Sequence, residues 1–385
     1  MVHAFRRNDN AQPSPVIMTA ASAPGKCILF GEHAVVYGQP AIAVAIEQRC
    51  EVKIEETTTE NWIIDGSNYL PEKHPHVEGL RNRLWFQGPS LKLNIISEVP
   101  AGSGLGSSAA LSIALAAAMR AKKGRRVGTD GSWHEGYSSE INQTDAYSDN
   151  LQKTDPGSIC IGGKKLFGID AIDSDELGIL GHAVEAASQG GRASPTDTAA
   201  VSLGGAVLVS DKREESAEWQ YSRNLKTPEG ERKWEVHKIS LPESFDEVSL
   251  VIGDTGVHAP TGDMVAGVAE LLQKDPEKMQ EIVAIGKLVR RATIAMKDGD
   301  LQALGNAMTE NHLLLRGLGV SHPKLENLIK AAAPYSLGVK LTGAGGGGCM
   351  IALTTQPETV SQAIEMAGGT AYISRLGAGG VHLHQ

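Results

Sequence analysis

The chain has 385 residues, of which 41% are apolar and 21% charged, which is typical of a globular protein. This length exceeds what one hydrophobic core usually serves, so two packed domains are expected. The formal net charge of −9 argues against a nucleic-acid partner, because phosphate backbones attract clusters of Lys and Arg that this chain lacks.

The spacing of the cysteines and the length of the apolar segments indicate the cellular compartment of the protein. Cys27, Cys50, Cys160 and Cys349 do not have the spacing of metal ligands, and the first residues do not resemble a secretory signal. The longest apolar helix candidate, Ala109–Met119, is too short to cross a bilayer. We therefore expect a cytoplasmic protein without a membrane partner.

The first domain is expected over residues 17–205. Before it, residues 1–16 are polar and carry Pro13 and Pro15, which predicts a disordered N-terminal segment. Alternating, β-branched stretches predict strands at residues 51–56, 62–64 and 91–96. The Ala- and Leu-rich stretch 109–123 follows a Gly/Ser loop and predicts a helix.

A polar stretch interrupts this domain. Residues 122–167 are rich in Gly, Ser, Asp, Asn and Thr and have no sustained period, which predicts a long surface insertion. A helical pattern resumes at Asp173, an expected N-cap with Glu176 three residues later, as in a capping box. This helix is expected to end near Gly190 and Gly191.

The second domain is expected over residues 206–385. Strand-like residues 206–210 and 248–252 flank a charged stretch, 211–233, which predicts a solvated hairpin or loop. The remaining patterns predict three helices, 276–297, 300–315 and 324–333, and two strands, 339–341 and 350–353, around a glycine-rich turn.

The strongest chemical signal is the segment Pro100–Ala110, which places three glycines between a strand and the Ala-rich helix. Glycines let successive N–H groups approach an oxyanion, and the helix N-terminus adds a positive dipole. The pattern predicts a phosphate-binding loop in which Ser107 and Ser108 offer hydroxyls to phosphate or Mg²⁺. It is neither a Walker A loop nor a dinucleotide fingerprint. A plain Gly/Ser turn is the alternative.

Two further segments contain residue types that are common in catalytic or binding sites. Ala23–Gly38 contains Lys26 and the pair Glu32 and His33 within a small, apolar strand. Taken alone, the lysine is more often a surface residue and the histidine more often structural. Lys340–Cys349 is a run of glycines bounded by strands, which permits close backbone approach but also fits a hairpin turn.

These three segments, in this order, resemble the motifs of the galactokinase, homoserine kinase, mevalonate kinase and phosphomevalonate kinase (GHMP kinase) superfamily. Within it, Gly31–Ala41 resembles the mevalonate kinases, since galactokinases carry Thr-Asp-Tyr after Gly-Glu-His. Ser194–Thr198 and Leu203–Gly205 resemble elements of archaeal-like mevalonate kinases. The resemblance covers residues 17–121 and 170–385, and the polar insertion has no counterpart in it.

The resemblance implies an α+β, two-domain GHMP kinase fold. The N-terminal domain would be a ribosomal-protein-like α/β domain with a left-handed βαβ unit, and the C-terminal domain a ferredoxin-like α+β domain. The active site would lie in the cleft between them. ATP and Mg²⁺ are the implied cofactors, mevalonate is the implied small-molecule substrate, and a homodimer is the implied assembly.

The resemblance also assigns the ATP site. The residues implied in binding the ATP phosphates are Pro100, Gly102, Ser103, Gly104, Leu105, Gly106, Ser107 and Ser108. Ser108 and Glu185 would hold Mg²⁺, for which a hydroxyl and a carboxylate are suitable hard ligands. The alternative for Glu185 is an exposed helix glutamate.

Asp197 and Lys26 are the implied catalytic residues, and Asp197 would accept or orient the proton of the C5 hydroxyl of mevalonate. Lys26 would lie beside it and beside the transferring phosphate, where its charge favours the ionised carboxylate. An N-cap or Asx-turn is the alternative for Asp197. Six residues are implied near the substrate: Glu32, His33, Ser194, Thr261, Gly343 and Ala344. Of these, His33 is the expected donor to substrate oxygens, and Glu32 has a structural alternative.

The expected activity is ATP-dependent phosphorylation of the C5 hydroxyl of (R)-mevalonate in isoprenoid biosynthesis. The alternatives are another kinase or a decarboxylase of the superfamily, a catalytically silent metabolite sensor on the same fold, and an unrelated nucleotide-binding module. A sensor would be expected to lack at least one of Lys26, Ser108 and Asp197, and all three are present. Three other histidines lack ligand spacing and are interpreted as surface or structural residues: His182, His258 and His312.

Overall fold

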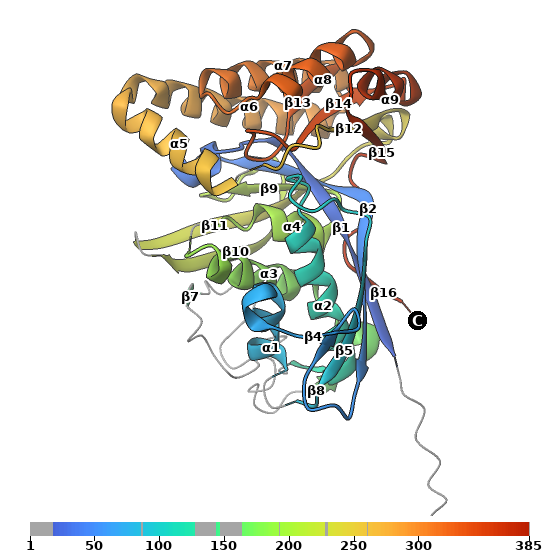
Figure 1. Cartoon of the computed structure of the whole chain (residues 1–385). Helices are drawn as coiled ribbons and strands as arrows, with labels where there is room; N and C mark the ends of the chain where they lie inside the picture. The colour runs from blue at the N-terminus through green and yellow to red at the C-terminus, as the bar shows by residue number, and fades with distance from the viewer. Residues whose placement is uncertain are drawn as a thin grey trace, which may run out of the picture.

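The computed structural model describes residues 18–85, 88–127, 144–146, 164–191, 193–227, 230–259 and 261–384. They form two stacked units, of which the upper one in Figure 1 contains the orange and red helices. The predicted disorder of residues 1–16 lies outside the described residues, as does most of the polar insertion. None of the described helices has the length and apolar character needed to span a bilayer.

A ten-stranded sheet organises the lower unit, and the long strand β2 lies at its centre. One edge of β2 pairs with β1, while its other edge pairs with β9 through residues 41–44 and with β5 through residues 50–56. The strands are β1 (Thr19–Phe30), β2 (Ala41–Glu56), β3 (Ile63–Ile64), β4 (Ser67–Asn68), β5 (Leu91–Ser97), β7 (Thr144–Ala146), β9 (Ala206–Ser210), β10 (Glu218–Thr227), β11 (Gly230–Ile239) and β16 (His382–His384). The predicted strands at residues 51–56, 62–64 and 91–96 are confirmed within β2, β3 and β5.

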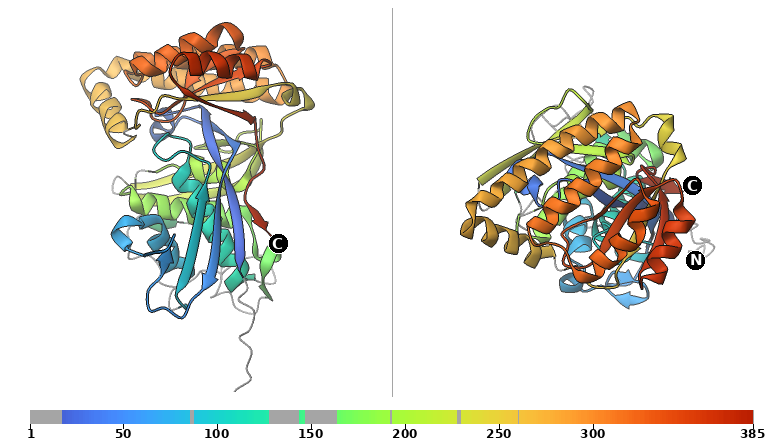
Figure 2. Two further views of the ribbon diagram at one scale, coloured as in Figure 1. Left: turned by 45° about the vertical axis from the view of Figure 1, so that its right-hand side comes forward. Right: turned by 90° about the horizontal axis from the view of Figure 1, so that it is seen from above.

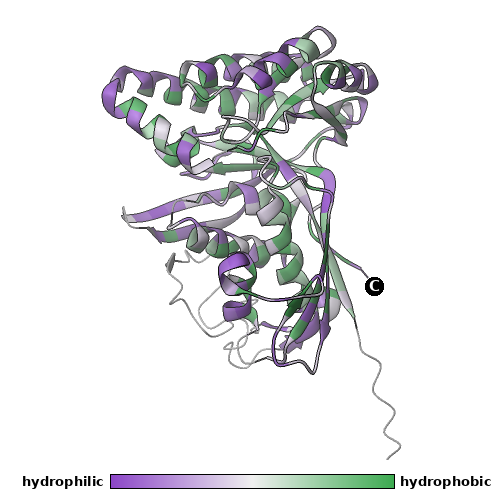
Figure 3. Cartoon of the chain, in the orientation of Figure 1, coloured by the Kyte–Doolittle hydropathy of each residue, from purple (hydrophilic) through white to green (hydrophobic). Residues whose placement is uncertain are grey.

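Helix α2 runs through the middle of this unit and is buried on nearly all sides. Its alanines allow close packing against β1, β2 and three neighbouring helices, and Figure 3 shows the apolar colour gathered along it. The helices of this unit are α1 (Pro75–Leu84), α2 (Ser107–Lys123), α3 (Ser174–Ser188) and α4 (Thr196–Leu203). The predicted helix at 109–123 is confirmed. The predicted cap of α3 is also confirmed, because Asp173 accepts hydrogen bonds from the backbone N–H groups of Asp175 and Glu176.

Most of the charged stretch 211–233 lies in an antiparallel hairpin of β10 and β11, so the predicted hairpin is confirmed, but it is solvated on one face only. Four apolar side chains of its inner face are buried: Tyr221, Leu225, Trp234 and Val236. Because β11 pairs with β9 and β9 with β2, the first sheet continues beyond the boundary expected after residue 205. We propose instead that the first domain extends to Ile239 and that the second begins at Ser249.

The upper unit is an antiparallel sheet in the order β13-β14-β12-β15, the ferredoxin-like arrangement implied by the resemblance. Strand β14 is apolar because both of its faces are buried: Met350 and Ala352 contact the helices, while Cys349, Ile351 and Leu353 join the core shared with the lower unit. Figure 2 shows the helices lying across the outer side of this sheet.

The elements of the upper unit are β12 (Ser249–Asp254), α5 (Thr261–Lys274), α6 (Met279–Asp298), α7 (Leu301–Gly317), α8 (Pro323–Ala332), β13 (Gly338–Leu341), β14 (Cys349–Thr354), α9 (Pro357–Met366) and β15 (Thr370–Arg375). The three predicted helices and two predicted strands are confirmed here as α6, α7, α8, β13 and β14. Helices α5 and α9 were not predicted.

After β15 the chain returns to the first sheet. Residues 377–384, here called the C-terminal strap, bond to β2 and to the end of α4. The N–H of Ala378 donates to the carbonyl of Ala45 at 3.0 Å, and that of Val381 donates to the carbonyl of Ser202 at 3.2 Å. Strand β16 then pairs with β1, as the left view of Figure 2 shows.

The described ends of the polar insertion are ordered against the first domain. Strand β6 (Arg125–Val127) pairs with β8 (Lys164–Leu166), and β7 pairs with the edge strand β10. Arg125 is buried, and its guanidinium lies 3.3 Å from carboxylates of both Asp173 and Glu176. The insertion expected from residue 122 therefore begins with residues that belong to the folded domain.

Candidate active site

The first glycine-rich segment forms the turn that opens α2. Gly102, Gly104 and Gly106 have φ angles of +69°, +80° and +76°. A left-handed conformation at alternate residues is the pattern of backbone nests that bind anions. Helix α2 has no side-chain cap at its N-terminus, so its first N–H groups have no side-chain acceptor there. Together these features form a suitable phosphate site, unlike a plain turn.

The second glycine-rich segment, residues 343–348, lies directly against this loop. A Cβ atom on Gly343 would be 3.5 Å from the Cα of Gly104, and one on Gly348 would be 2.7 Å from the carbonyl oxygen of Ser103. The contact at Gly348 therefore requires a glycine, whereas at Gly343 a Cβ would make an ordinary contact and the φ of +78° favours glycine instead. The close backbone approach that this run of glycines permits is therefore made to the phosphate loop.

An ion pair of Lys26 and Asp197 lies beside the loop. The Nζ of Lys26 is 3.0 Å from Oδ2 of Asp197 and donates to the carbonyl of Gly104 at 2.9 Å. The lysine side chain is 3% exposed and the aspartate 32%. Asp197 is in the first turn of α4, whose N-cap is Pro195. The surface-lysine and N-cap alternatives are therefore excluded.

A second polar pair joins α2 to α3. The hydroxyl of Ser108 donates to Oε1 of Glu185 at 2.6 Å, and Glu185 is buried rather than exposed. Burial first, and then the charge of Asp197, raises the pKa of Glu185 to about 7, against opposing effects of Ser108 and Lys26. Because these charges affect one another, the two pairs form a single cluster.

Two side chains that the sequence did not single out contact Glu185. The Nε2 of His76, on α1, lies 3.8 Å from Oε1 of Glu185, and Gln189 donates to Oε2 at 3.3 Å. Burial lowers the pKa of His76, so its ring is neutral at pH 7. No sequence signal marks His76, because its contact depends on how α1 packs against α3.

Glu32 belongs to a buried ion pair between the two units. Its Oε1 contacts the Nζ of Lys340 on β13, and the amide of Asn311 on α7 donates to its Oε2 at 3.2 Å. Burial lowers the pKa of Lys340, while the charge of Glu32 opposes that change. Both carboxylate oxygens of Glu32 thus have protein partners, which supports the structural alternative for this residue.

His33 has an uncommon backbone conformation, with a φ of +54°, next to the second glycine-rich segment. Its Nε2 is 2.8 Å from the carbonyl oxygen of Ala344, which only accepts, so Nε2 carries the hydrogen. Burial lowers the pKa of His33, so the ring is neutral at pH 7 and Nδ1 is an acceptor. This Nδ1 is buried and has no hydrogen-bond partner among the described residues.

The last two predicted substrate residues lie on different units. Ser194 donates to the hydroxyl of Thr196 at 3.0 Å, immediately before the turn that carries Asp197. Thr261 is exposed at the first residue of α5. His258, interpreted as a surface or structural residue, is exposed and lies against the phosphate loop, where a Cβ on Gly102 would be 2.6 Å from its Nδ1.

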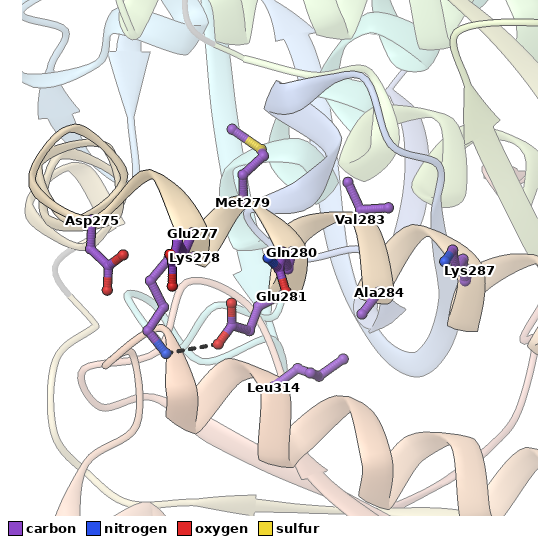
Figure 4. Close-up of a pocket in the computed structure, with 10 residues that line it drawn as sticks. All are labelled: Asp275, Glu277, Lys278, Met279, Gln280, Glu281, Val283, Ala284, Lys287 and Leu314. Carbon is purple, nitrogen blue, oxygen red and sulfur yellow. Dashed lines mark hydrogen bonds and ion pairs between the residues drawn. The ribbon is translucent and has the colours of Figure 1, made fainter.

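A surface hollow of about 860 Å³ lies elsewhere, between the start of α6 and the C-terminal end of α7. Figure 4 shows the ion pair of Lys278 and Glu281 in it, 2.7 Å apart, with Leu314 of α7 beside the glutamate. None of the predicted site residues lines this hollow. We therefore place the candidate active site at the glycine loops and the two polar pairs.

Comparison with known proteins identifies the family. Residues 76–149 match the family described as GHMP kinases N terminal domain, and residues 292–373 match GHMP kinases C terminal. The mevalonate kinase of Thermococcus gammatolerans is 31% identical over 95% of this chain and 98% of its own length. The chain belongs to the mevalonate kinase family of GHMP kinases. The mevalonate kinase of Methanothermobacter thermautotrophicus is also 31% identical, over 87% of this chain and 89% of its own length.

Solved structures share the fold across this superfamily. The L. major mevalonate kinase in complex with R-mevalonate has a TM-score of 0.65 and 22% identity, covering 92% of this chain and 94% of that one. The Lactococcus lactis galactokinase complexed with galactose has a TM-score of 0.62 and 18% identity, covering 95% of each chain. A mevalonate kinase and a sugar kinase thus share this fold, so the fold alone does not select the acceptor.

Proposed function

We propose that this mevalonate kinase family member transfers the γ-phosphoryl group of ATP to the C5 hydroxyl of (R)-mevalonate. The observation that carries the proposal is the ion pair of Lys26 and Asp197 beside the glycine loop at the start of α2. Phosphoryl transfer requires mainly that an acceptor be positioned in line with the γ-phosphate and that charge be neutralised. The Lys26–Asp197 pair and the glycine loop lie side by side, so together they can position an acceptor and neutralise the charge of the phosphates.

In this proposal Asp197 accepts the C5 hydroxyl proton as that oxygen attacks the γ-phosphorus, and ADP leaves. The partly exposed carboxylate is accessible to an acceptor, whereas the enclosed Lys26 is held by Asp197 and by the carbonyl of Gly104. The ammonium group then stabilises negative charge on the transferring phosphoryl oxygens. The N–H groups of residues 102–108 hold the ATP phosphates.

Ser108 and Glu185 are a suitable donor set for Mg²⁺. A hydroxyl and a carboxylate already lie 2.6 Å apart, and Mg²⁺ takes few protein ligands besides substrate phosphates and water. The described residues contain no cluster of three or more His, Cys, Asp or Glu side chains that would suit a more fully coordinated metal. When bound there, the ion neutralises charge on the phosphates.

The environment of His33 supports an acceptor substrate with a second hydroxyl group. The neutral ring has a buried acceptor, Nδ1, without a partner among the described residues, so it would accept a hydrogen bond, in place of the donor role implied by the resemblance. The C3 hydroxyl of mevalonate is such a donor.

Initial rates with four acceptors test the proposal: mevalonate, phosphomevalonate, homoserine and galactose at equal ATP and Mg²⁺. ADP release should depend on mevalonate, and phosphorus NMR of the product should show a monoester on its primary carbon. Higher catalytic efficiency with another acceptor would reassign the substrate within the GHMP kinases. Absence of ADP release with all four would favour a silent sensor.

A further inference from the structure

His182 is fully buried on α3, three residues before Glu185. It is structural rather than a surface residue. Its Nε2 lies 3.0 Å from the carbonyl oxygen of Ala193, and its Nδ1 lies 2.9 Å from the Nε of Arg223 on β10. The imidazole therefore links the helix that carries Glu185 to the segment that leads into Asp197.

The chemistry of the partners fixes the direction of both hydrogen bonds. A guanidinium only donates, so Nδ1 of His182 accepts from Arg223, and Nε2 must carry the hydrogen that it donates to Ala193. Burial first, and then the charge of Arg223, lowers the pKa of His182 to about 3, so the ring is neutral at pH 7. The edge of the ring packs against Trp234, with ring centroids 5.5 Å apart.

The carbonyl of Ala193 is coupled to the catalytic carboxylate through a short, constrained segment. Pro195 follows it and accepts the N–H of Ala199 at 2.9 Å, which closes the first turn of α4. Helix α4 also packs directly on α3, because a Cβ on Gly181 would lie only 3.2 Å from Cγ2 of Thr198. A shift of Ala193 would therefore be transmitted to Asp197 and not absorbed by a loose loop.

We infer that His182 is a positioning residue that, through the Ala193 carbonyl, fixes Asp197 relative to Glu185. The inference rests on the proposed function, since it assigns to His182 an effect on the step that Asp197 performs. A purely structural histidine would stabilise the fold without affecting that step. The two roles differ in what a substitution does to turnover.

His237 is a matched control for this difference. It is also fully buried, its Nε2 accepts from the N–H of Glu214 at 3.0 Å, and its Nδ1 lies 3.3 Å from the carbonyl of Leu208. Its partners lie on β9 and the following turn, away from the Ala193–Asp197 segment. His182→Phe and His237→Phe remove equivalent pairs of hydrogen bonds from the same domain.

We expect both Phe variants to lower Tm, but only His182→Phe to lower kcat for mevalonate, by roughly 10- to 100-fold, because small displacements of a reacting group have effects of this size. ATP affinity, measured by fluorescent-nucleotide titration, should stay within about threefold of wild type in both, since the phosphate loop is untouched. His182→Gln should recover most of kcat, because its amide reaches Ala193 and its oxygen accepts from Arg223.

Epistasis with Asp197 decides between the roles. In an Asp197→Asn background, His182→Phe should cause no further loss of kcat, because the carboxylate that it positions is absent. An equal loss in both backgrounds, or equal kcat losses in the His182 and His237 variants, would overturn the inference. If His182→Phe does not fold, His182→Asn replaces it, because the asparagine amide is too short to reach Ala193. The kcat of His182→Gln should then exceed that of His182→Asn. Equal kcat values in these two variants would overturn the inference. An inactive wild-type enzyme would instead refute the proposed function.

Discussion

Lys26 and Asp197 lie 3.0 Å apart although their backbones belong to different elements, β1 and α4. The lysine is enclosed and the aspartate remains partly open. The ammonium group is therefore immobilised at the phosphate loop, while one carboxylate oxygen remains accessible to an acceptor. This arrangement explains why the pair should act as a unit.

Asp197→Asn should lower kcat by roughly 10²–10⁴-fold, because the isosteric amide cannot take a proton and positioned general bases contribute this much. Binding of ATP should change little. Lys26→Met should also lower kcat, and the double variant should lose much less than the product of the two single losses. Steady-state rates with mevalonate measure all three, and multiplicative losses would show that the residues act independently.

Ser108→Ala should raise the Mg²⁺ concentration needed for half-maximal activity, with partial recovery in Mn²⁺, because it removes one of few protein ligands. Ser112→Ala is the matched control. Ser112 lies about one turn further along α2, is buried, and its hydroxyl has no hydrogen-bond partner among the described residues. Equal metal dependence in the two variants would contradict the assignment of Ser108.

The raised pKa of Glu185 predicts a pH dependence of stability in the metal-free protein. Its pKa is about 7 in the folded chain and 4.5 as an ordinary carboxyl, so between these values the folded state holds a proton that the unfolded state has lost. The free energy of unfolding should therefore fall as pH rises from about 4.5 to 7, by on the order of 3 kcal/mol.

Urea unfolding of wild type and Glu185→Gln at pH 5 and pH 8, without Mg²⁺, measures this effect. The Gln variant should be the more stable of the two at pH 8, and the difference should nearly vanish at pH 5. Saturating Mg²⁺ and ATP should restore the free energy of unfolding of the wild-type protein at pH 8, because they bind only the folded state. A difference that does not change with pH would mean that Glu185 titrates normally.

Lys340→Met should destabilise the protein by about 3–5 kcal/mol, because it leaves the carboxylate of Glu32 buried without its counter-charge. Adding Glu32→Gln to that variant should recover part of the loss, since the uncompensated charge is then absent. Chemical denaturation of the two single variants and the double variant gives the coupling energy. Additive effects would show that the contact contributes no net interaction.

Local patterns predicted much of the fold, because the decisive interactions are close in sequence. The Ala-rich run predicted α2, Asp173 predicted the cap of α3, and the run of glycines in 343–348 predicted a close backbone approach. The pairing of Lys26 with Asp197 came only from the family resemblance. Composition and spacing do not specify which distant strand or helix a lysine will contact.

The features that were missed depend on long-range packing. His76 reaches Glu185 because α1 lies against α3, and Lys340 reaches Glu32 because β13 of the upper unit lies against the first domain. The domain boundary that we propose after Ile239 is later than the one expected from the sequence, because the charged residues of β10 and β11 concealed a buried face that continues the first sheet. Amphipathic hairpins of this kind have the composition of a solvated loop.

The C-terminal strap affects how the chain folds as it leaves the ribosome. Strand β1 can pair with β2 early in synthesis, but its other partner, β16, is translated only after the whole of the upper unit. The end of α4, whose first turn carries Asp197, likewise receives the backbone hydrogen bond from Val381 only then. A nascent chain stalled before the C-terminal strap would hold every residue of both polar pairs and yet have an unfinished first domain, so activity should appear only after the strap has emerged.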